Sequence, residues 1–237
     1  MVTLDIGNLP SREVNQRLKE LAAENERIEV LNPRSLHNFA VGLQSKVEVV
    51  VQGSLGIYVG GFMQGPTIVI RGETGWYTGD NMIDGRIIVK GNTGSNAAPS
   101  MIGGEVVVEG HSGSRAGYGL KGGNVVICGN VGLETGKMML GGRIVVLGKA
   151  GAKIGESMYG GVIHVLGQVE GVGSNVIVGS PTGKEAEELE KLLSRLGLRV
   201  KVTDFTTFTP RPGKHSYVLF QPEHGRASVE TSGNNRS

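Results

Sequence analysis

The sequence predicts an all-β protein, a right-handed, single-stranded parallel β-helix of seven 19-residue turns with helical or irregular caps at both ends. Three observations predict this fold. Glycine accounts for 40 of the 237 residues, far above its ordinary share of about 7%. A short β-branched segment recurs every 19 residues, and glycines interrupt the stretch between two such segments. Each glycine would cost a helix about 1 kcal/mol, so the second half of each unit is not helical.

A glycine closes each β-branched segment and defines the repeat. These glycines form a ladder that we expect to be structural: Gly53, Gly72, Gly91, Gly110, Gly129, Gly148 and Gly167. Further glycine columns follow three, seven and thirteen residues later in most units. In a β-helix with one turn per unit, adjacent turns stack about 4.8 Å apart. Glycine then provides either positive φ or room for the neighbouring backbone.

The β-branched segments predict both an interior and an unusual outer face. Four and two residues before each ladder glycine stands Val or Ile, and alternation along a strand points both positions inward. The position between them points outward and should be polar on a solvated face. It is aliphatic in six units: Val50, Val69, Ile88, Val107, Val126 and Val145. A C-terminal helix can cover only part of this stripe. We therefore expect a partner surface that includes Val69, Ile88, Val107 and Val126.

The chain ends are expected to cover the stack. The chain divides into an N-terminal cap, the β-helix, a C-terminal helix with short strands, and a disordered tail: residues 1–46, 47–179, 180–222 and 223–237. Ser11 is expected to N-cap a helix over about 12–25. Thr182 and Glu185 have capping-box spacing before a second helix, and Gly197 suits the C′ position that ends it. The short strands are expected at 198–202 and 216–220.

Composition argues against several classes of function. Lys and Arg number 24 and Asp and Glu 22, a balance that argues against nucleic-acid binding. The single cysteine, Cys128, excludes a disulfide framework and any multi-cysteine zinc or iron–sulfur site. The start of the chain does not read as a signal peptide, and no apolar run reaches membrane-spanning length. We expect a cytoplasmic protein with no catalytic, cofactor-binding or metal-ligating residue of its own.

Aromatic residues and one histidine suggest further contact points. Tyr58 and Tyr77 are 19 residues apart, so their rings should stack on adjacent turns, and Trp76 lies beside them. Two interpretations stay open for this group, packing against a cap or docking of a partner. His164 replaces an aliphatic residue in the outward column. It is expected to lie at an interface or to be hydrogen-bonded within the chain.

The repeated pattern Gly-x-x-Gly-x-x-x-Gly…Met-x-Gly-Gly over residues 47–179 resembles a known family. It is similar to the GXGXG β-helix at the C-terminal end of the glutamate synthase large subunit. The flanking SREVNQRL and NPRSLHNFAVGL resemble two stand-alone versions of this β-helix. These are the β-helical subunits of archaeal-type split glutamate synthase and of N-methylglutamate synthase. The β-helical subunit of formylmethanofuran dehydrogenase is similar over the repeats. The last turn departs from the pattern, since Glu170 and Ser174 replace glycines.

The resemblance implies a non-catalytic scaffold subunit of a glutamate synthase-type complex, in which glutamine-derived ammonia reaches a 2-oxoacid at a flavin site. The implied partners are a glutamine amidotransferase subunit and an FMN-binding synthase subunit. FMN and an iron–sulfur cluster would be bound by these partners and not by this chain. The β-helical subunit of formylmethanofuran dehydrogenase is the alternative. A free-standing carbohydrate-active β-helix is disfavoured, because acidic residues do not stack into a repeated pair.

Overall fold

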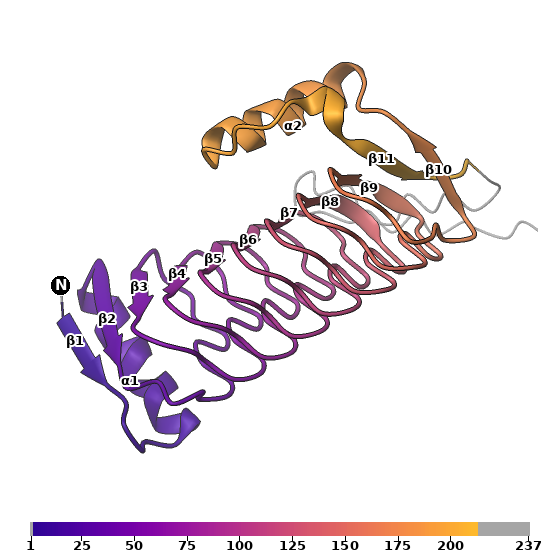
Figure 1. The fold of residues 1–237 in the computed structure, drawn as a ribbon. Coiled ribbons are helices and arrows are strands. Elements are labelled where there is room, and N and C mark those ends of the chain that lie inside the picture. Colours follow the sequence, from indigo (N-terminus) through magenta and orange to yellow (C-terminus); the bar gives the residue numbers. More distant parts are fainter. Residues whose placement is uncertain (1, 213–237) are drawn as a thin grey trace, which may run out of the picture.

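One continuous sheet runs the length of the molecule in the computed structural model, which describes residues 2–212 (Figure 1). The strand order is β1-β2-β3-β4-β5-β6-β7-β8-β9-β11-β10. Strands β1 to β9 pair in parallel, whereas β11 pairs antiparallel with β9 and β10 antiparallel with β11. Each turn from β3 to β9 contributes one strand, and consecutive partners are 19 residues apart, as Ile87 and Val106 are. The predicted β-solenoid of about seven turns is confirmed.

The elements divide into nine parallel strands, two α-helices, a 3₁₀ turn and a final antiparallel pair. In chain order they are β1 (Val2–Asp5), α1 (Ser11–Glu24), β2 (Arg27–Leu31), β3 (Glu48–Val51), β4 (Thr67–Ile70), β5 (Arg86–Val89), β6 (Glu105–Val108), β7 (Asn124–Ile127), β8 (Leu140–Val146), β9 (Gly160–Val165), β10 (Val176–Gly179), α2 (Gly183–Arg195), the 3₁₀ turn η1 (Val202–Asp204) and β11 (Thr206–Pro210). Strands β3 to β9 are the predicted β-branched segments. The predicted strand 216–220 and the predicted tail 223–237 lie outside the described residues.

The core is a column of aliphatic side chains along the solenoid axis. Every Val or Ile at the two predicted inward positions of β3 to β9 is fully buried. A second inward column comes from the glycine-rich half of each turn: Met63, Met82, Met101, Leu120, Met139 and Met158, all at 0% exposure. Each turn therefore has apolar contacts above and below, which explains why a single turn could not stand alone.

The ladder glycines are required by close backbone approach. A Cβ on Gly129 would lie 2.6 Å from the carbonyl oxygen of Gly110 in the preceding turn. The same holds along the ladder from Gly72 to Gly167, and none of these has φ in the left-handed region. Positive φ by itself does not demand glycine in this fold, because Ser100 (φ 53°) and Met138 (φ 56°) adopt it.

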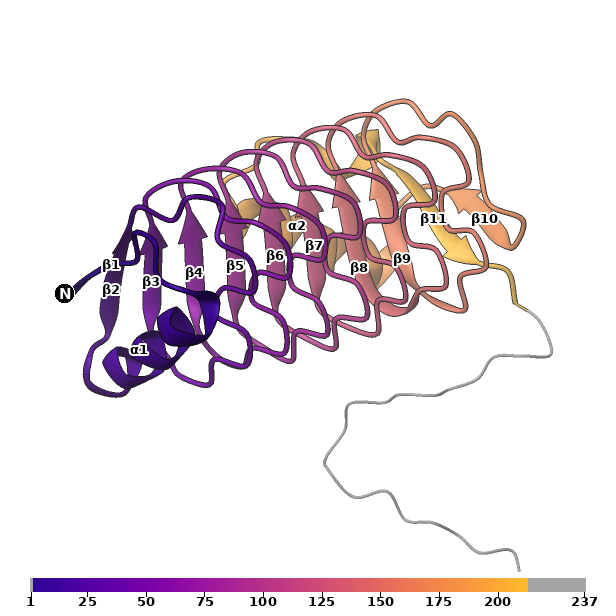
Figure 2. The same ribbon diagram turned by 90° about the horizontal axis from the view of Figure 1, so that it is seen from below.

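The N-terminal end is built differently from the predicted cap. The sheet already begins at β1, and Ile28 of β2 pairs with Val49 of β3, so the stack extends into residues 1–46. Helix α1 closes this end with Val14 and Leu18 buried against the core (Figure 2). The predicted N-cap role of Ser11 is wrong. Ser11 is the first helical residue, and its hydroxyl donates to the His37 carbonyl at 2.7 Å.

Helix α2 is confirmed. Its two ends differ in how their free backbone groups are capped. Thr182 occupies the N-cap position but makes no side-chain capping bond. The C-terminal end is a Schellman motif. Gly197 has φ 70° and donates its N–H to the Ser194 carbonyl at 3.0 Å, and the next N–H, of Leu198, donates to the Leu193 carbonyl at 2.9 Å.

The predicted strand at 198–202 is wrong. Residues 198–201 are irregular and lead into η1. The reason is packing: Leu198, Val200 and Val202 lie against the hydrophobic cluster beneath α2. Strand β11 pairs with the sheet instead, and it lies between β9 and the edge strand β10.

Candidate docking surfaces

Helix α2 lies along the outward aliphatic column and covers much of it (Figure 1). Val107 is 7% exposed, and Val126 and Val145 are completely buried. They share a hydrophobic cluster with Leu189 and Leu192 of α2. Val107 and Val126 therefore do not form the exposed partner surface that the sequence predicts. The reason is that α2 packs across the three consecutive turns that contain Val107, Val126 and Val145.

The uncovered end of the same column is small. Val69 and Ile88, the other two residues of the predicted partner surface, are half-buried. Ile88 packs at the margin of the cluster beneath α2. Val50, at the N-terminal end, is 5% exposed. Together these residues leave no broad apolar face on this side of the sheet.

Ion pairs attach α2 to the sheet at two levels. Glu188 of α2 accepts from Arg143 of β8 at 2.6 Å, which lowers the pKa of that carboxyl. Near the other end of the helix, Arg195 binds the buried carboxylate of Glu105 in β6, and the side chain of Arg86 lies 2.8 Å from the same carboxylate. These contacts fix the helix in register with particular turns.

His164 lies under the start of α2 and is completely buried. Its Nδ1 is 3.0 Å from the Thr207 hydroxyl of β11, and its ring meets Phe205 edge-on at 6.4 Å between centroids. Glu185 of α2 approaches Nδ1 at 3.7 Å. Burial, with a smaller contribution from Arg143, lowers the pKa of His164 to about 3. The histidine is therefore neutral and serves as an internal contact between sheet, helix and β11.

The aromatic group forms as predicted. The rings of Tyr58 and Tyr77 stack at 4.7 Å between centroids with 6° between their planes. Both residues are half-buried with positive φ, while Trp76 beside them is 58% exposed. The stacked pair is thus part of the solenoid wall, and only Trp76 offers a large free surface.

Further along the tyrosine column, charges neutralise one another. Glu134 accepts from Arg115 and from Lys137, both at 2.7 Å. These two bonds lower the pKa of Glu134 to about 2. The column is therefore aromatic at one end and ion-paired at the other, which limits its apolar part to two turns.

An exposed apolar ridge occupies a different side of the solenoid, and the sequence argument missed it. The ridge consists of Ile83, Ile102, Leu140 and Tyr159, which are 37–44% exposed and lie eleven residues after four of the five ladder glycines from Gly72 to Gly148. Phe62 and Met138, also exposed, lie two positions before the ridge column in their own turns. The sequence does contain this column, as an apolar residue in every turn but one between Ile83 and Tyr159. Its exposure is not predicted, because the column lies in the glycine-rich half of each turn, where no strand is expected.

Lys121 occupies the middle position of the ridge, between Ile102 and Leu140. It is half-buried and makes no ion pair with another residue of the described part of the chain. Burial raises the pKa of Asp80, and the Asn81 hydrogen bond and the charge of Lys121 act in the opposite direction. The ridge is therefore apolar at both ends with one cation at its centre.

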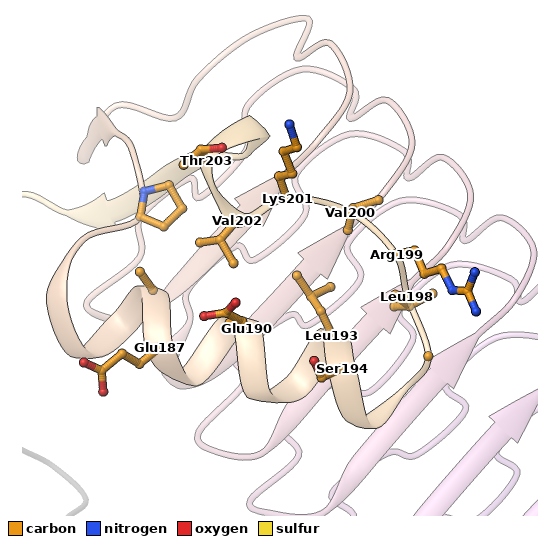
Figure 3. A pocket seen from close by; sticks show the side chains of 13 residues that line it. Glu187, Glu190, Leu193, Ser194, Leu198, Arg199, Val200, Lys201, Val202 and Thr203 are labelled. Carbon is orange, nitrogen blue, oxygen red and sulfur yellow. The ribbon is translucent and has the colours of Figure 1, made fainter.

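A groove of about 840 Å³ lies between α2 and the segment that returns after it (Figure 3). Its floor includes Leu193 and Val202, and Glu190 and Lys201 stand beside them (Figure 3). Its lining mixes side chains of opposite charge with apolar ones, so it favours no one ligand.

Candidate chemistry within the chain is sparse. Burial raises the pKa of the Cys128 thiol, which makes it a weaker nucleophile. Residues 2–212 hold no group of three or more His, Cys, Asp and Glu side chains placed for a metal ion. Neither α-helix of this part of the chain combines the length and hydropathy of a membrane-spanning helix.

The fold and its surfaces define a β-solenoid built on a glycine ladder, with one outer column covered by its own helix and another left exposed. The chain belongs to the GXGXG family, since the family model described as "GXGXG motif" matches residues 35–206, well over half of the sequence. No curated protein matches the sequence.

A solved structure shares the fold. It is the formyltransferase/hydrolase complex (FhcABCD) from Methylorubrum extorquens in complex with methylofuran. One of its chains superimposes with a TM-score of 0.66 at 21% sequence identity, over 81% of this chain and 83% of that chain. At this identity the similarity shows the fold alone. The neighbour is itself part of a multi-subunit complex, as its description states.

Proposed function

We propose that this chain is a non-catalytic scaffold subunit of a multi-subunit enzyme. The observation that carries the proposal is the apolar ridge, which stays exposed although the chain covers its other outward apolar column with α2. Contiguous exposed apolar surface marks a partner site. A stack of seven turns about 4.8 Å apart forms a stiff spacer of about 30 Å, long enough to contact two modules at once.

The enzyme we propose is a glutamate synthase-type complex. The repeat pattern and its flanking segments support this choice. The partners would be a glutamine amidotransferase subunit and an FMN-binding synthase subunit. The donor set of this chain does not fit an iron–sulfur cluster, because a cluster needs several thiolates and Cys128 is the single cysteine. We therefore propose that FMN and the cluster are bound by the partners, while this chain holds the partners in place.

The similarity to a chain of the formyltransferase/hydrolase complex favours a second candidate, a formyl-transfer complex related to formylmethanofuran dehydrogenase. The scaffold role would be the same and the partners different. Purification of the tagged chain from its native cell, with the recovered subunits identified by mass spectrometry, separates the two. An amidotransferase with a flavin synthase supports the first candidate, and formyl-transfer subunits support the second. Recovery of the chain alone overturns both.

A reconstituted complex tests the scaffold role itself. If the chain holds two active sites together, the flavin subunit supplied with free ammonium should work without it. Glutamine-dependent synthesis should fall at least about tenfold, because ammonia released into water is diluted. Equal glutamine-dependent rates with and without the chain would contradict the scaffold role.

A further inference from the structure

We propose that the apolar ridge binds a single amphipathic helix of a partner subunit, which lies along the solenoid axis and places a carboxylate opposite Lys121. The inference rests on the proposed function, since it names the element that a partner would use. The apolar contacts would be made with Ile83, Ile102, Leu140 and Tyr159.

The backbone of the ridge favours contact through side chains. The N–H of Ile102 donates to Met82 and that of Tyr159 to Met139, each at 2.8 Å and each to the preceding turn. The remaining ridge residues donate in the same way. An added β-strand would find these donors already used. The side chains, in contrast, recur once per turn at about 4.8 Å, close to the helix pitch of about 5.4 Å.

The chain shows the same arrangement on its other side. Helix α2 lies over Val107, Val126 and Val145, which are also one residue per turn. Glu188 and Arg195 of that helix pair with charges of the sheet and set its register. The solenoid thus already accommodates a helix over a column of outward aliphatic residues, with ion pairs that determine its position.

The charge at the centre of the ridge argues against a second copy of this chain. The five turns from Ile83 to Tyr159 have Lys121 as their midpoint. A two-fold axis through the centre of the ridge, which would overlap the whole ridge with its copy, would bring two Lys121 side chains together, a like-charge contact that disfavours association. A different partner with an acidic residue would instead neutralise Lys121 as the contact becomes dry.

The test compares two leucines of one turn. Leu140 lies on the ridge and Leu133 lies elsewhere, and they are 37% and 49% exposed. Leu140→Glu and Leu133→Glu are introduced separately into the tagged chain, which is purified with its complex from the native cell. We expect Leu140→Glu to reduce recovery of the partner at least about tenfold, as the loss of a buried anchor does, and Leu133→Glu to change it less than about twofold. Thermal melting of each free chain checks the fold, and Ile102→Glu repeats the test at a second ridge position.

A photo-crosslinking amino acid at position 140 of the assembled complex identifies the occupant. A cross-link to a partner helix supports the proposal. A charge swap tests Lys121: binding lost in Lys121→Glu should return when a basic residue replaces the carboxylate of the partner helix. A cross-link to a second copy of this chain, or to a non-helical segment, overturns it. Full recovery with folded Leu140→Glu also overturns it, while the proposed function stands. A wild-type chain that purifies alone overturns both.

Discussion

Two outward apolar columns on this solenoid differ in their exposure to solvent. The column of Val107, Val126 and Val145 is buried by α2 of the same chain, and ion pairs at Glu105 and Arg143 fix that helix. The ridge from Ile83 to Tyr159 has similar composition and spacing but remains 37–44% exposed. A solenoid can thus repeat apolar residues on more than one outer column and still fold, although its own helix covers only one of them.

This difference separates outer residues that stabilise the chain from outer residues that are available to bind a partner. A covered column should contribute to the free energy of unfolding of the isolated chain, because its burial is completed within that chain. An exposed column should contribute little until a partner arrives. Four experiments test this contrast, from the frame that both columns share to the histidine at the edge of the covered one.

The largest effect is expected where the shared frame is broken. Gly129→Ala would place a Cβ 2.6 Å from the Gly110 carbonyl oxygen, so two turns must separate. We expect a loss of more than about 3 kcal/mol in the free energy of unfolding, measured by urea titration. Gly119→Ser is the control, because Ser100 in the preceding turn already adopts φ 53° at the equivalent position. A loss as large for the control would contradict the close-approach explanation.

The covered and exposed columns should respond differently to charge. Val126→Lys would bury an ammonium group beneath α2 and should cost about 3–5 kcal/mol. Leu140→Lys, on the ridge, should cost less than about 1 kcal/mol, since its side chain reaches water. Thermal and urea unfolding of the isolated chain measure both. Similar losses at the two positions would remove the contrast between the columns.

The ion pairs that hold α2 should contribute less than its apolar face. Glu105→Gln removes the buried charge that meets Arg86 and Arg195, and we expect a loss of about 2 kcal/mol. Glu109→Gln is the matched control, because Glu109 pairs with Lys90 in an exposed position, where the loss should be below about 1 kcal/mol. A larger effect at Glu109 would show that α2 is not held at Glu105.

The last effect, of similar size, appears only when the pH is lowered. His164 has a folded pKa of about 3, below its ordinary value of 6.5, so the unfolded chain binds the extra proton. The contribution of neutral His164 to the free energy of unfolding is therefore fully present above pH 6.5 and is lost as the pH falls toward 3. His164→Val should gain about 2 kcal/mol relative to wild type between pH 7 and pH 5. Glu185, whose pKa burial raises, changes stability in the opposite direction as pH falls, but it is present in both proteins and cancels in the comparison. Parallel pH profiles of the two proteins would contradict the assignment.

Much of the fold followed from local pattern. The 19-residue spacing of Val and Ile, with glycine after them, determines strand, interior and register together, because a one-residue slip would turn every core residue outward. The stacking of Tyr58 on Tyr77 followed from the same spacing. The N-cap at Ser11 and the strand at 198–202 did not follow. A neighbouring carbonyl in one case and an apolar cluster in the other outweighed the local preference.

The sequence by itself therefore determined the repeating unit, its interior column and the glycine ladder, since each depends on contacts between residues one turn apart. Only the tertiary structure decided which outer column is free. That outcome depends on where α2 packs, and α2 meets Val107 and Val126 across more than 60 positions of the chain. Periodicity carries no information about such a distant contact, because Val107 and Ile102 are equally apolar in the sequence. Their difference in exposure arises from the helix that covers one and leaves the other to solvent.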